Sequence, residues 1–457
     1  MNIINPANET IITTLESDSP KIIRSVYETA RKHQPDWAAV PLKERLDMIS
    51  RFKESLDTNI DSLAATLTSE MGKPVWQSRN EIRGAIGRIE FFLNNSEKWL
   101  SEEWMTEEDL LGEKIVFEPL GVIGNISAWN YPYLVGVNVF IPALIAGNAV
   151  LYKPSEHAAL TGLQIEQLLH EAGVPREVFS ALTGGGAVGK EMLELPLDGY
   201  FFTGSYRTGK FIYEKVATKM VPCQLELGGK DPLYVNADNS YIDAVAKAAV
   251  EGVFYNGGQS CCAVERIYVH EKHYDAFVES FIAETDKLKL GDPMDEETFI
   301  GPLVRKEQVH FLQQQVGDAL LKGANIVYGE ERWEGKGFYF IPTILTDVDH
   351  SMRLMTEESF GPLIGIQKVK NDAEAIALMQ DTSYGLTAAV YSDTLASAEP
   401  IMKKMKTGTV YWNCCDRVSA PLPWSGRKHS GIGSTLSYMG IRAFVQPKAY
   451  HLRGLRD

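Results

Sequence analysis

Apolar residues recur every three to four positions through the first hundred residues, a spacing typical of amphipathic helices. One such stripe runs from Leu46 to Leu56, and its helical pattern continues to a Gly-Lys-Pro stop at 72–74. A second stripe predicts a helix over about 77–100. The N-terminal part of the chain is therefore expected to be helical.

From residue 121 onward, short apolar runs alternate with helical stretches. Runs typical of buried strands lie at 121–127, 148–153, 179–182 and 199–203. After Glu226 the alternation resumes, with strands expected at 233–235, 266–269 and 388–391 and helices at 241–255 and 271–287. Strands separated by helices of about 10–15 residues indicate βαβ units and a parallel sheet. We therefore expect an α/β chain with two such layers.

Two strand-like segments, 104–118 and 444–452, lie outside either alternation. An isolated strand exposes unpaired backbone groups along both edges, which favours pairing with another strand. We therefore expect these segments to pair with a partner subunit.

Length and charge narrow the class of protein. At roughly 150 residues per domain, 457 residues predict two or three domains. The 45 Lys and Arg against 60 Asp and Glu give a formal charge of −15, which disfavours partners bound through phosphate neutralisation, nucleic acids above all. The same charge disfavours anionic membranes, and the most apolar stretch, Val139 to Tyr152, is too short to span a bilayer.

Five cysteines, an odd number without a C-x-x-C pair, fit neither a disulfide scaffold nor a structural zinc site. The N-terminus has no basic region followed by an apolar core, so we expect no signal peptide. We therefore expect a cytoplasmic protein without a metal site.

One glycine-rich segment partly matches the sequence pattern of a phosphate-binding loop. Residues 184–190 fit G-x-x-x-x-G-K, but Glu191 follows where such a loop needs Ser or Thr to hold magnesium. No G-x-G-x-x-G follows the first expected strand either, so the ordinary dinucleotide fingerprint is absent from this sequence. We interpret 184–190 as a turn between a strand and a helix.

Two other segments carry residues suited to chemistry. In 254–262 a predicted helix ends at two glycines and Cys261 and Cys262 follow, a loop in which a thiol can be exposed as a nucleophile. In 225–232, Glu226 stands between two leucines at a strand end. Apolar surroundings raise a carboxyl pKa and suit it to general-base work. Taken alone, the cysteine could be a small buried residue of the core, and the glutamate could be a helix cap or the ion-pair partner of Lys230.

Together these segments resemble the aldehyde dehydrogenase superfamily. The family's glutamate signature matches 225–232, and its cysteine signature, an aromatic residue, three residues and Gly-Gln-x-Cys, matches 254–261. Five further motifs match the family in the family's order. They lie at 128–132, 153–156, 202–209, 358–362 and 428–431. The resemblance as a whole covers the chain from about residue 20 onward.

The resemblance implies two Rossmann-like parallel-sheet domains and a small β-strand oligomerisation arm. It assigns the cofactor-binding domain to 1–102 and 119–226, the catalytic domain to 227–432, and the arm to 103–118 and 433–457. Because family members use this arm to build a sheet across subunits, a homodimer or a homotetramer is expected.

The resemblance also implies a mechanism. Cys261 attacks the aldehyde, the Asn130 amide and the Cys261 backbone N–H stabilise the oxyanion, and hydride transfer leaves a thioester that Glu226 hydrolyses through a water. NAD is the expected cofactor, because Glu156 would face the adenosine ribose and would disfavour the phosphate of NADP. The other cofactor contacts that the resemblance assigns are Ile126, Trp129, Lys153, Ser155, Gly204, Ser205, Leu227, Glu358 and Phe360.

The physiological aldehyde stays open, with a small-to-medium aldehyde preferred. Residues expected to line the substrate tunnel are Tyr131, Leu134, Phe254, Ser260, Cys262 and Trp424. A betaine-type aldehyde would use an aromatic cage, but Asn138 stands where such relatives often have Trp. A semialdehyde with a carboxylate would need an arginine, and Arg417 is a candidate whose field Asp416 would partly cancel.

Two other classes remain. CoA-acylating relatives lack the glutamate at position 226, so its presence disfavours that class, and an intact set of nucleophile, base and oxyanion donor disfavours a non-catalytic relative. Some positions depart from the family pattern: Ala128 replaces the usual Pro, and Ser434-Thr435 replaces a charged pair. These departures concern substrate choice more than reaction type, and the roles of Cys414 and Cys415 stay open.

Overall fold

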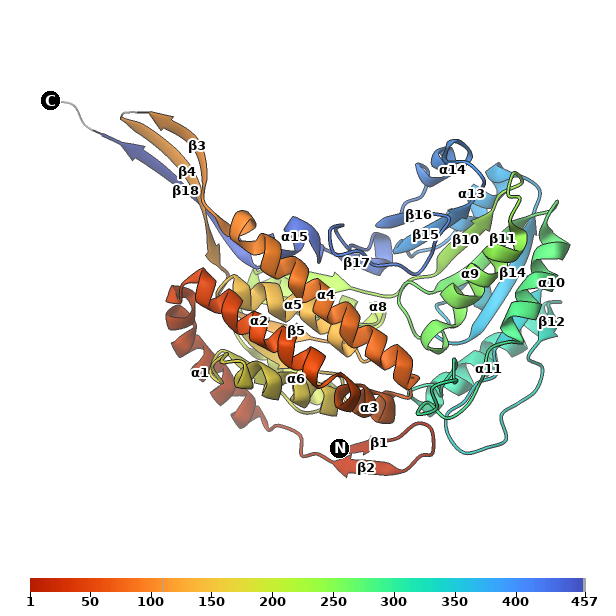
Figure 1. Ribbon diagram of the computed structural model, residues 1–457, viewed down its shortest axis with the longest axis horizontal. Helices are drawn as coiled ribbons and strands as arrows, with labels where there is room; N and C mark the ends of the chain where they lie inside the picture. The colour runs from red at the N-terminus through yellow and green to blue at the C-terminus, as the bar shows by residue number, and fades with distance from the viewer. Residues whose placement is uncertain (109, 455–457) are drawn as a thin grey trace.

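The computed structural model describes residues 1–108 and 110–454. Two predominantly parallel sheets, each covered by helices, form two lobes, and a narrow three-stranded sheet projects from one of them (Figure 1). The predicted α/β fold class, with two Rossmann-like layers, is confirmed.

The first sheet has the strand order β17-β9-β8-β5-β6-β7. Its strands are β5 (Val122–Ile126), β6 (Ala149–Lys153), β7 (Phe179–Ala181), β8 (Gly199–Thr203), β9 (Cys223–Glu226) and β17 (Gly431–Ile432). All neighbours are parallel except β17, which runs antiparallel to β9 with Gly431 opposite Glu226. Residues 431–432 therefore belong to this sheet, although the expected boundary groups them with the second lobe.

Helices bury the faces of this sheet because their apolar residues recur on one side. They are α1 (Pro20–Ala39), α2 (Leu42–Thr58), α3 (Ile60–Met71), α4 (Val75–Leu100), α5 (Pro132–Ile145), α6 (Ala159–Glu171), α7 (Gly186–Glu194) and α8 (Tyr206–Val216). The predicted run through 46–72 is two helices that meet at Asn59. The segment 184–190, interpreted from its sequence as a turn between a strand and a helix, is a turn only at 184–185, and its other residues form the start of α7.

The second sheet has the strand order β12-β13-β14-β11-β10-β15-β16, parallel except for β12. Its strands are β10 (Asp231–Val235), β11 (Val264–His270), β12 (Asn325–Tyr328), β13 (Thr343–Thr346), β14 (Leu363–Val369), β15 (Thr387–Tyr391) and β16 (Thr409–Trp412). The helices of this lobe are α9 (Ile242–Phe254), α10 (Tyr274–Thr285), α11 (Lys306–Leu321), α12 (Arg353–Thr356), α13 (Asp372–Gln380) and α14 (Leu395–Met402).

The projecting sheet joins distant parts of the chain. It pairs β3 (Glu103–Glu108) and β4 (Leu111–Pro119) with β18 (Val445–Arg453), which follows α15 (Ser437–Arg442). The segments predicted as strands at 104–118 and 444–452 thus pair with each other within one chain (Figure 1). A short hairpin, β1 (Asn2–Ile4) with β2 (Ile11–Thr14), lies in the N-terminal part that was expected to be helical.

Candidate active site

The loop before Cys261 is built on left-handed backbone. Asn256, Gly257 and Gly258 have φ angles of 55°, 61° and 71°, which glycine adopts without a steric penalty. A side chain on Gly258 would place its Cβ 2.4 Å from the carbonyl oxygen of Gly361. The loop therefore turns tightly against the second lobe, and Cys261 leaves it partly exposed.

Glu226 ends strand β9 and is half-buried. Burial raises its pKa to about 7, although a hydrogen bond from the Thr435 hydroxyl and the charge of Arg88 act in the opposite direction. A carboxyl that titrates near neutrality can take up and release a proton at physiological pH. The side chain therefore has the property that the sequence predicted for a general base.

Asn130 stands in the loop between β5 and α5, and its side-chain Nδ2 donates to the carbonyl oxygen of Gln259, at 3.1 Å. Its own carbonyl oxygen accepts from Lys73 Nζ at 2.7 Å and from Asn256 Nδ2 at 3.3 Å. Because Asn256 Nδ2 also donates to Gln259, at 3.1 Å, these bonds join the Asn130 loop to the loop that ends at Cys261.

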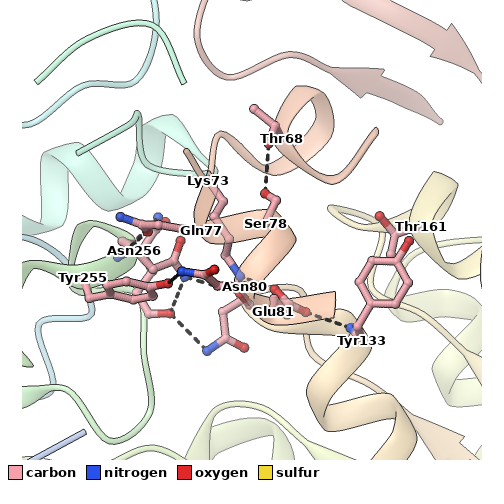
Figure 2. Close-up of polar contacts among 12 residues, drawn as sticks. Thr68, Lys73, Gln77, Ser78, Asn80, Glu81, Tyr133, Thr161, Tyr255 and Asn256 are labelled. Atoms are coloured by element: carbon pink, nitrogen blue, oxygen red, sulfur yellow. Dashed lines mark hydrogen bonds and ion pairs between the residues drawn. The ribbon is translucent and has the colours of Figure 1, made fainter. Parts of the chain in front are cut away.

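A buried network at the start of α4 supports both loops (Figure 2). Lys73 and Glu81 form an ion pair whose side chains are fully buried. Glu81 accepts from the backbone N–H of Tyr133 at 2.8 Å, and Gln77 Oε1 accepts from the backbone N–H of Asn256 at 2.9 Å (Figure 2). Residues 73–81 thus fix the backbone at and after Asn130 and the backbone that precedes Cys261.

Two cavities, of about 620 and 470 Å³, meet at the candidate nucleophile and base. Their shared lining is Tyr131, Val135, Glu226, Cys261 and Trp424. The larger cavity opens between α4, α5 and the 413–420 loop, and the smaller one lies toward β8 and the Glu358 loop. Two ligands can therefore reach the same thiol from opposite directions.

Most predicted cofactor residues gather at the smaller cavity. Those that line it are Trp129, Gly204, Ser205, Leu227, Glu358 and Phe360. Ser205 caps α8, whose N-terminus can face a pyrophosphate. Burial raises the pKa of Glu358 to about 8, and its Oε1 accepts from the backbone N–H of Gly229 at 3.0 Å.

The other predicted cofactor residues, Ile126, Lys153, Ser155 and Glu156, lie outside this lining, at the carboxyl ends of β5 and β6. Lys153 Nζ lies 3.3 Å from Glu156 Oε2, and only the glutamate is substantially exposed. Burial alone would raise the pKa of Glu156, but the charge of Lys153, a backbone hydrogen bond and the charge of His157 together outweigh it, so the pKa lies below its ordinary value. An ionised carboxylate therefore stands at the end of β6.

Five of the predicted tunnel residues line the larger cavity: Tyr131, Leu134, Ser260, Cys262 and Trp424. The assignment of Phe254 is wrong. Its side chain is fully buried in the core of the second lobe, with its ring 6.0 Å from that of Phe281. As the last residue of α9, it follows the apolar face of that helix away from the cavity.

The cavity also holds residues that the sequence analysis missed or weighed differently. Arg88, on α4, was not predicted; its only sequence signal is a basic residue within a helical stripe. Asp416 accepts hydrogen bonds from Ser260 Oγ and Cys262 Sγ, each at 3.0 Å, so these neutral donors stabilise its carboxylate in addition to the charge of Arg417. Cys414 and Cys415 also line this cavity.

In residues 1–108 and 110–454, no cluster of three or more His, Cys, Asp or Glu side chains could hold a metal ion. Among the helices described, none has the length and apolar character needed to cross a membrane.

Comparison with known proteins gives a consistent result. The model of the aldehyde dehydrogenase family matches residues 1–450. A succinate-semialdehyde dehydrogenase [NADP(+)] of Deinococcus radiodurans is 35% identical, covering 97% of this chain and 93% of the relative. Aminoaldehyde dehydrogenase 2 of Solanum lycopersicum is 33% identical, covering 98% and 90%.

A solved structure of betaine aldehyde dehydrogenase from Staphylococcus aureus in complex with NAD+ superposes with a TM-score of 0.95 at 30% identity, covering 99% of this chain and 92% of that one. Sequence and structure agree over nearly the whole length. The chain therefore belongs to the aldehyde dehydrogenase family, whose members are NAD(P)-dependent enzymes.

Proposed function

We propose that this enzyme oxidises a small-to-medium aldehyde to the carboxylic acid by a hydrolytic route, with Cys261 as nucleophile and Glu226 as general base. One observation carries the proposal: Cys261 and Glu226 both line the junction of the two cavities. An aldehyde in the larger cavity and a nicotinamide in the smaller one would meet at the same sulfur.

In the proposed first step, the Cys261 thiolate attacks the aldehyde carbon and the carbonyl oxygen becomes an oxyanion. Asn130 supports this step because its amide carries two donor hydrogens, of which one is directed at Gln259. The other remains for the oxyanion, beside the Cys261 backbone N–H. A single donor of this kind lowers the barrier by roughly 3–4 kcal/mol.

The smaller cavity suits a nicotinamide cofactor, because it combines a capped helix N-terminus, a carboxyl group and an aromatic pair. Ser205 and its helix would bind the pyrophosphate, and Glu358 would bind the nicotinamide ribose. NAD, when bound, supplies the hydride acceptor. Trp129 and Phe360, with ring centroids 5.5 Å apart, would position the nicotinamide ring.

The cofactor proposed is NAD. Lys153 and Glu156, with Ser155 and Ile126, would receive the adenosine half, and the ionised Glu156 would repel the extra phosphate of NADP. Lys153 limits this repulsion. We therefore propose a preference for NAD over NADP and not an absolute exclusion.

In the proposed last step, Glu226 takes a proton from a water molecule, which attacks the thioester and releases the acid. The discriminating variant is Glu226→Gln, which keeps the shape and removes the base. Steady-state turnover should fall by roughly 10²–10⁴-fold, while rapid mixing still shows a burst of NADH as the thioester accumulates.

Turnover with an aldehyde and NAD, monitored by NADH absorbance with and without CoA, separates the hydrolytic from the CoA-acylating class. Turnover that requires CoA, or an unchanged steady rate in Glu226→Gln, would refute the hydrolytic proposal. Absence of NADH formation with every aldehyde tested would favour a non-catalytic relative.

We further propose that the lobes divide as expected from the sequence, a cofactor-binding domain (1–102 and 119–226) and a catalytic domain (227–432, apart from β17). The projecting arm would hold two or four copies together. All five cysteines are free thiols, which supports a reducing compartment such as the cytoplasm.

A further inference from the structure

Arg88 occupies an unusual position for a charged side chain. It lies on α4, packs against α5, and lines the larger cavity, to which its accessible part is turned. Its Nη1 donates to the carbonyl oxygen of Leu134 at 3.1 Å and to Asn138 Oδ1 at 3.0 Å. One nitrogen of the guanidinium is thus anchored by two acceptors from the next helix.

The other two nitrogens of the Arg88 guanidinium remain available to donate hydrogen bonds to a ligand. Within the described part of the chain, Arg88 Nε and Nη2 donate to no protein atom, and no carboxylate forms an ion pair with Arg88. Beside it on the same helix, Gly87 has open space where a side chain would stand. A guanidinium keeps its charge even when buried, so the cavity presents a fixed cation with spare donors.

None of the acidic groups at the cavity forms an ion pair with Arg88 among the described residues, although the charge of Glu226 attracts its guanidinium. Glu81 is paired with Lys73 (Figure 2), Asp416 accepts from Ser260 and Cys262, and Glu226 accepts from Thr435. The fourth acidic group, Glu251, is exposed, as is the cation Arg417, so water screens the fields of both.

We propose that Arg88 recognises a carboxylate at the far end of the substrate, so that the preferred substrate is a short-chain aldehyde acid. This inference rests on the proposed function, since it names the substrate class of the same site. A planar guanidinium with two free donor directions matches a carboxylate. The same fixed charge repels aldehydes that carry an ammonium group, because the buried carboxylate of Glu81 is already paired with Lys73 and the free carboxylate of Glu251 is exposed to water.

The test compares three aldehydes that differ in charge: succinate semialdehyde, uncharged butanal and cationic betaine aldehyde. The unmodified enzyme should have its highest kcat/KM with succinate semialdehyde, mainly through a lower KM. In Arg88→Met the ratio of kcat/KM for succinate semialdehyde to that for butanal should fall about ten- to hundredfold, as expected for a lost charge-assisted hydrogen bond. Arg88→Lys should recover part of that ratio.

Arg83→Met is the matched control, because Arg83 lies on the same helix but is exposed and outside the cavity lining; it should leave the ratio unchanged. Asn138→Ala removes one anchor of Arg88 and should lower the ratio in the same direction even if Arg88→Met does not fold. A ratio near one in the unmodified enzyme, or equal losses on both aldehydes in the Arg88 variants, would overturn the inference.

Direct binding separates this inference from the proposed function. Calorimetry with the acids themselves requires no catalysis: succinate should bind more tightly than butyrate, and Arg88→Met should close that gap. If aldehydes are oxidised but succinate has no advantage, only the inference about Arg88 fails. If succinate binds preferentially but no aldehyde is oxidised, only the proposed function fails.

Discussion

The Thr435 hydroxyl donates a hydrogen bond to the carboxyl group of Glu226, although the two residues are 209 positions apart in the chain. The backbone of Thr435 pairs in turn with that of Trp424, which lines both cavities. Thr435 belongs to the dipeptide that replaces the charged pair usual in relatives. This departure therefore touches the candidate base directly and bears on its pKa.

Thr435→Val should shift the pH dependence of turnover. A hydrogen bond to the ionised carboxylate lowers its pKa, which burial has raised to about 7. Without the bond the pKa rises, so the variant should lose activity near neutral pH and recover it at higher pH. A profile of kcat against pH measures the midpoint; Thr435→Ser keeps the hydroxyl and should keep the midpoint, and an unmoved midpoint in Thr435→Val would refute this role.

The two adjacent cysteines should differ sharply in their contribution. Cys261→Ala should abolish NADH formation because it removes the proposed nucleophile. Cys262→Ala removes a donor to Asp416 and should keep measurable turnover, and Cys262→Ser, which restores a donor, should be the more active of the two. Initial rates with a saturating aldehyde decide the matter; an inactive Cys262→Ala beside an active Cys261→Ala would mean that the nucleophile has been misassigned.

Cofactor preference should respond to Glu156. A like charge at about 4 Å costs about 4 kcal/mol at an effective dielectric near 20, and less where water screens it. Even a third of that cost is about tenfold in affinity. Glu156→Ser should therefore raise kcat/KM with NADP and lower it with NAD. Steady-state kinetics with both cofactors test this; an unmodified enzyme that prefers NADP, or an unchanged ratio in the variant, would contradict it.

The buried pair of Lys73 and Glu81 should show strong coupling in stability. Lys73→Met leaves the Glu81 carboxyl buried without its cation, a change that typically costs about 3–5 kcal/mol. The double variant with Glu81→Gln removes both charges and keeps an acceptor for the Tyr133 N–H, so it should be less destabilised than Lys73→Met alone. Thermal unfolding of the three proteins measures the difference, with exposed Arg83→Gln as control. A double variant that unfolds earlier than the single one would contradict the expected coupling.

Burial decided part of what could be predicted from the sequence, although β13 and β14, which are buried over most or all of their length, were also missed. The strands β5, β6, β8 and β10 are buried over most or all of their length, so they appear as continuous apolar runs. The edge strands β12 and β16 are half exposed and only four residues long, which is too short for a clear signal. The hairpin of β1 and β2 was missed for the same reason.

In the candidate site, the residues that could be predicted are those that lie in contiguous motifs of the sequence. Signatures contiguous in the chain, around Glu226 and Cys261, identified the residues at the cavity junction. Arg88 and Thr435 reach the site through packing between distant elements, which no local pattern records. Phe254 was assigned to the cavity because it begins the cysteine signature, whereas the turn of α9 directs it into the core.

The open edge of the projecting sheet leads us to expect that the protein assembles into oligomers in solution. Strand β3 is an open edge of the three-stranded sheet, with Trp104 and Met105 exposed on it, and such edges favour pairing with another strand. Light scattering at micromolar protein should therefore give at least twice the chain mass of 50.9 kDa. Replacing both exposed side chains by Lys should weaken assembly, with Met220→Lys, at an exposed site outside the arm, as control. A mass near that of one chain for the unmodified protein would refute the prediction.

The pairing of β17 with β9 has a consequence for synthesis on the ribosome. The strand that carries Glu226 emerges early. In the described part of the chain, however, its outer edge is covered only by residues 431–432, and the Glu226 carboxyl group accepts a hydrogen bond only from Thr435. A nascent chain that has not yet reached these residues has an exposed strand edge and a base without its hydroxyl partner. The candidate catalytic centre is therefore completed late in translation, so that a truncated product would carry the proposed nucleophile, Cys261, without a finished site around it.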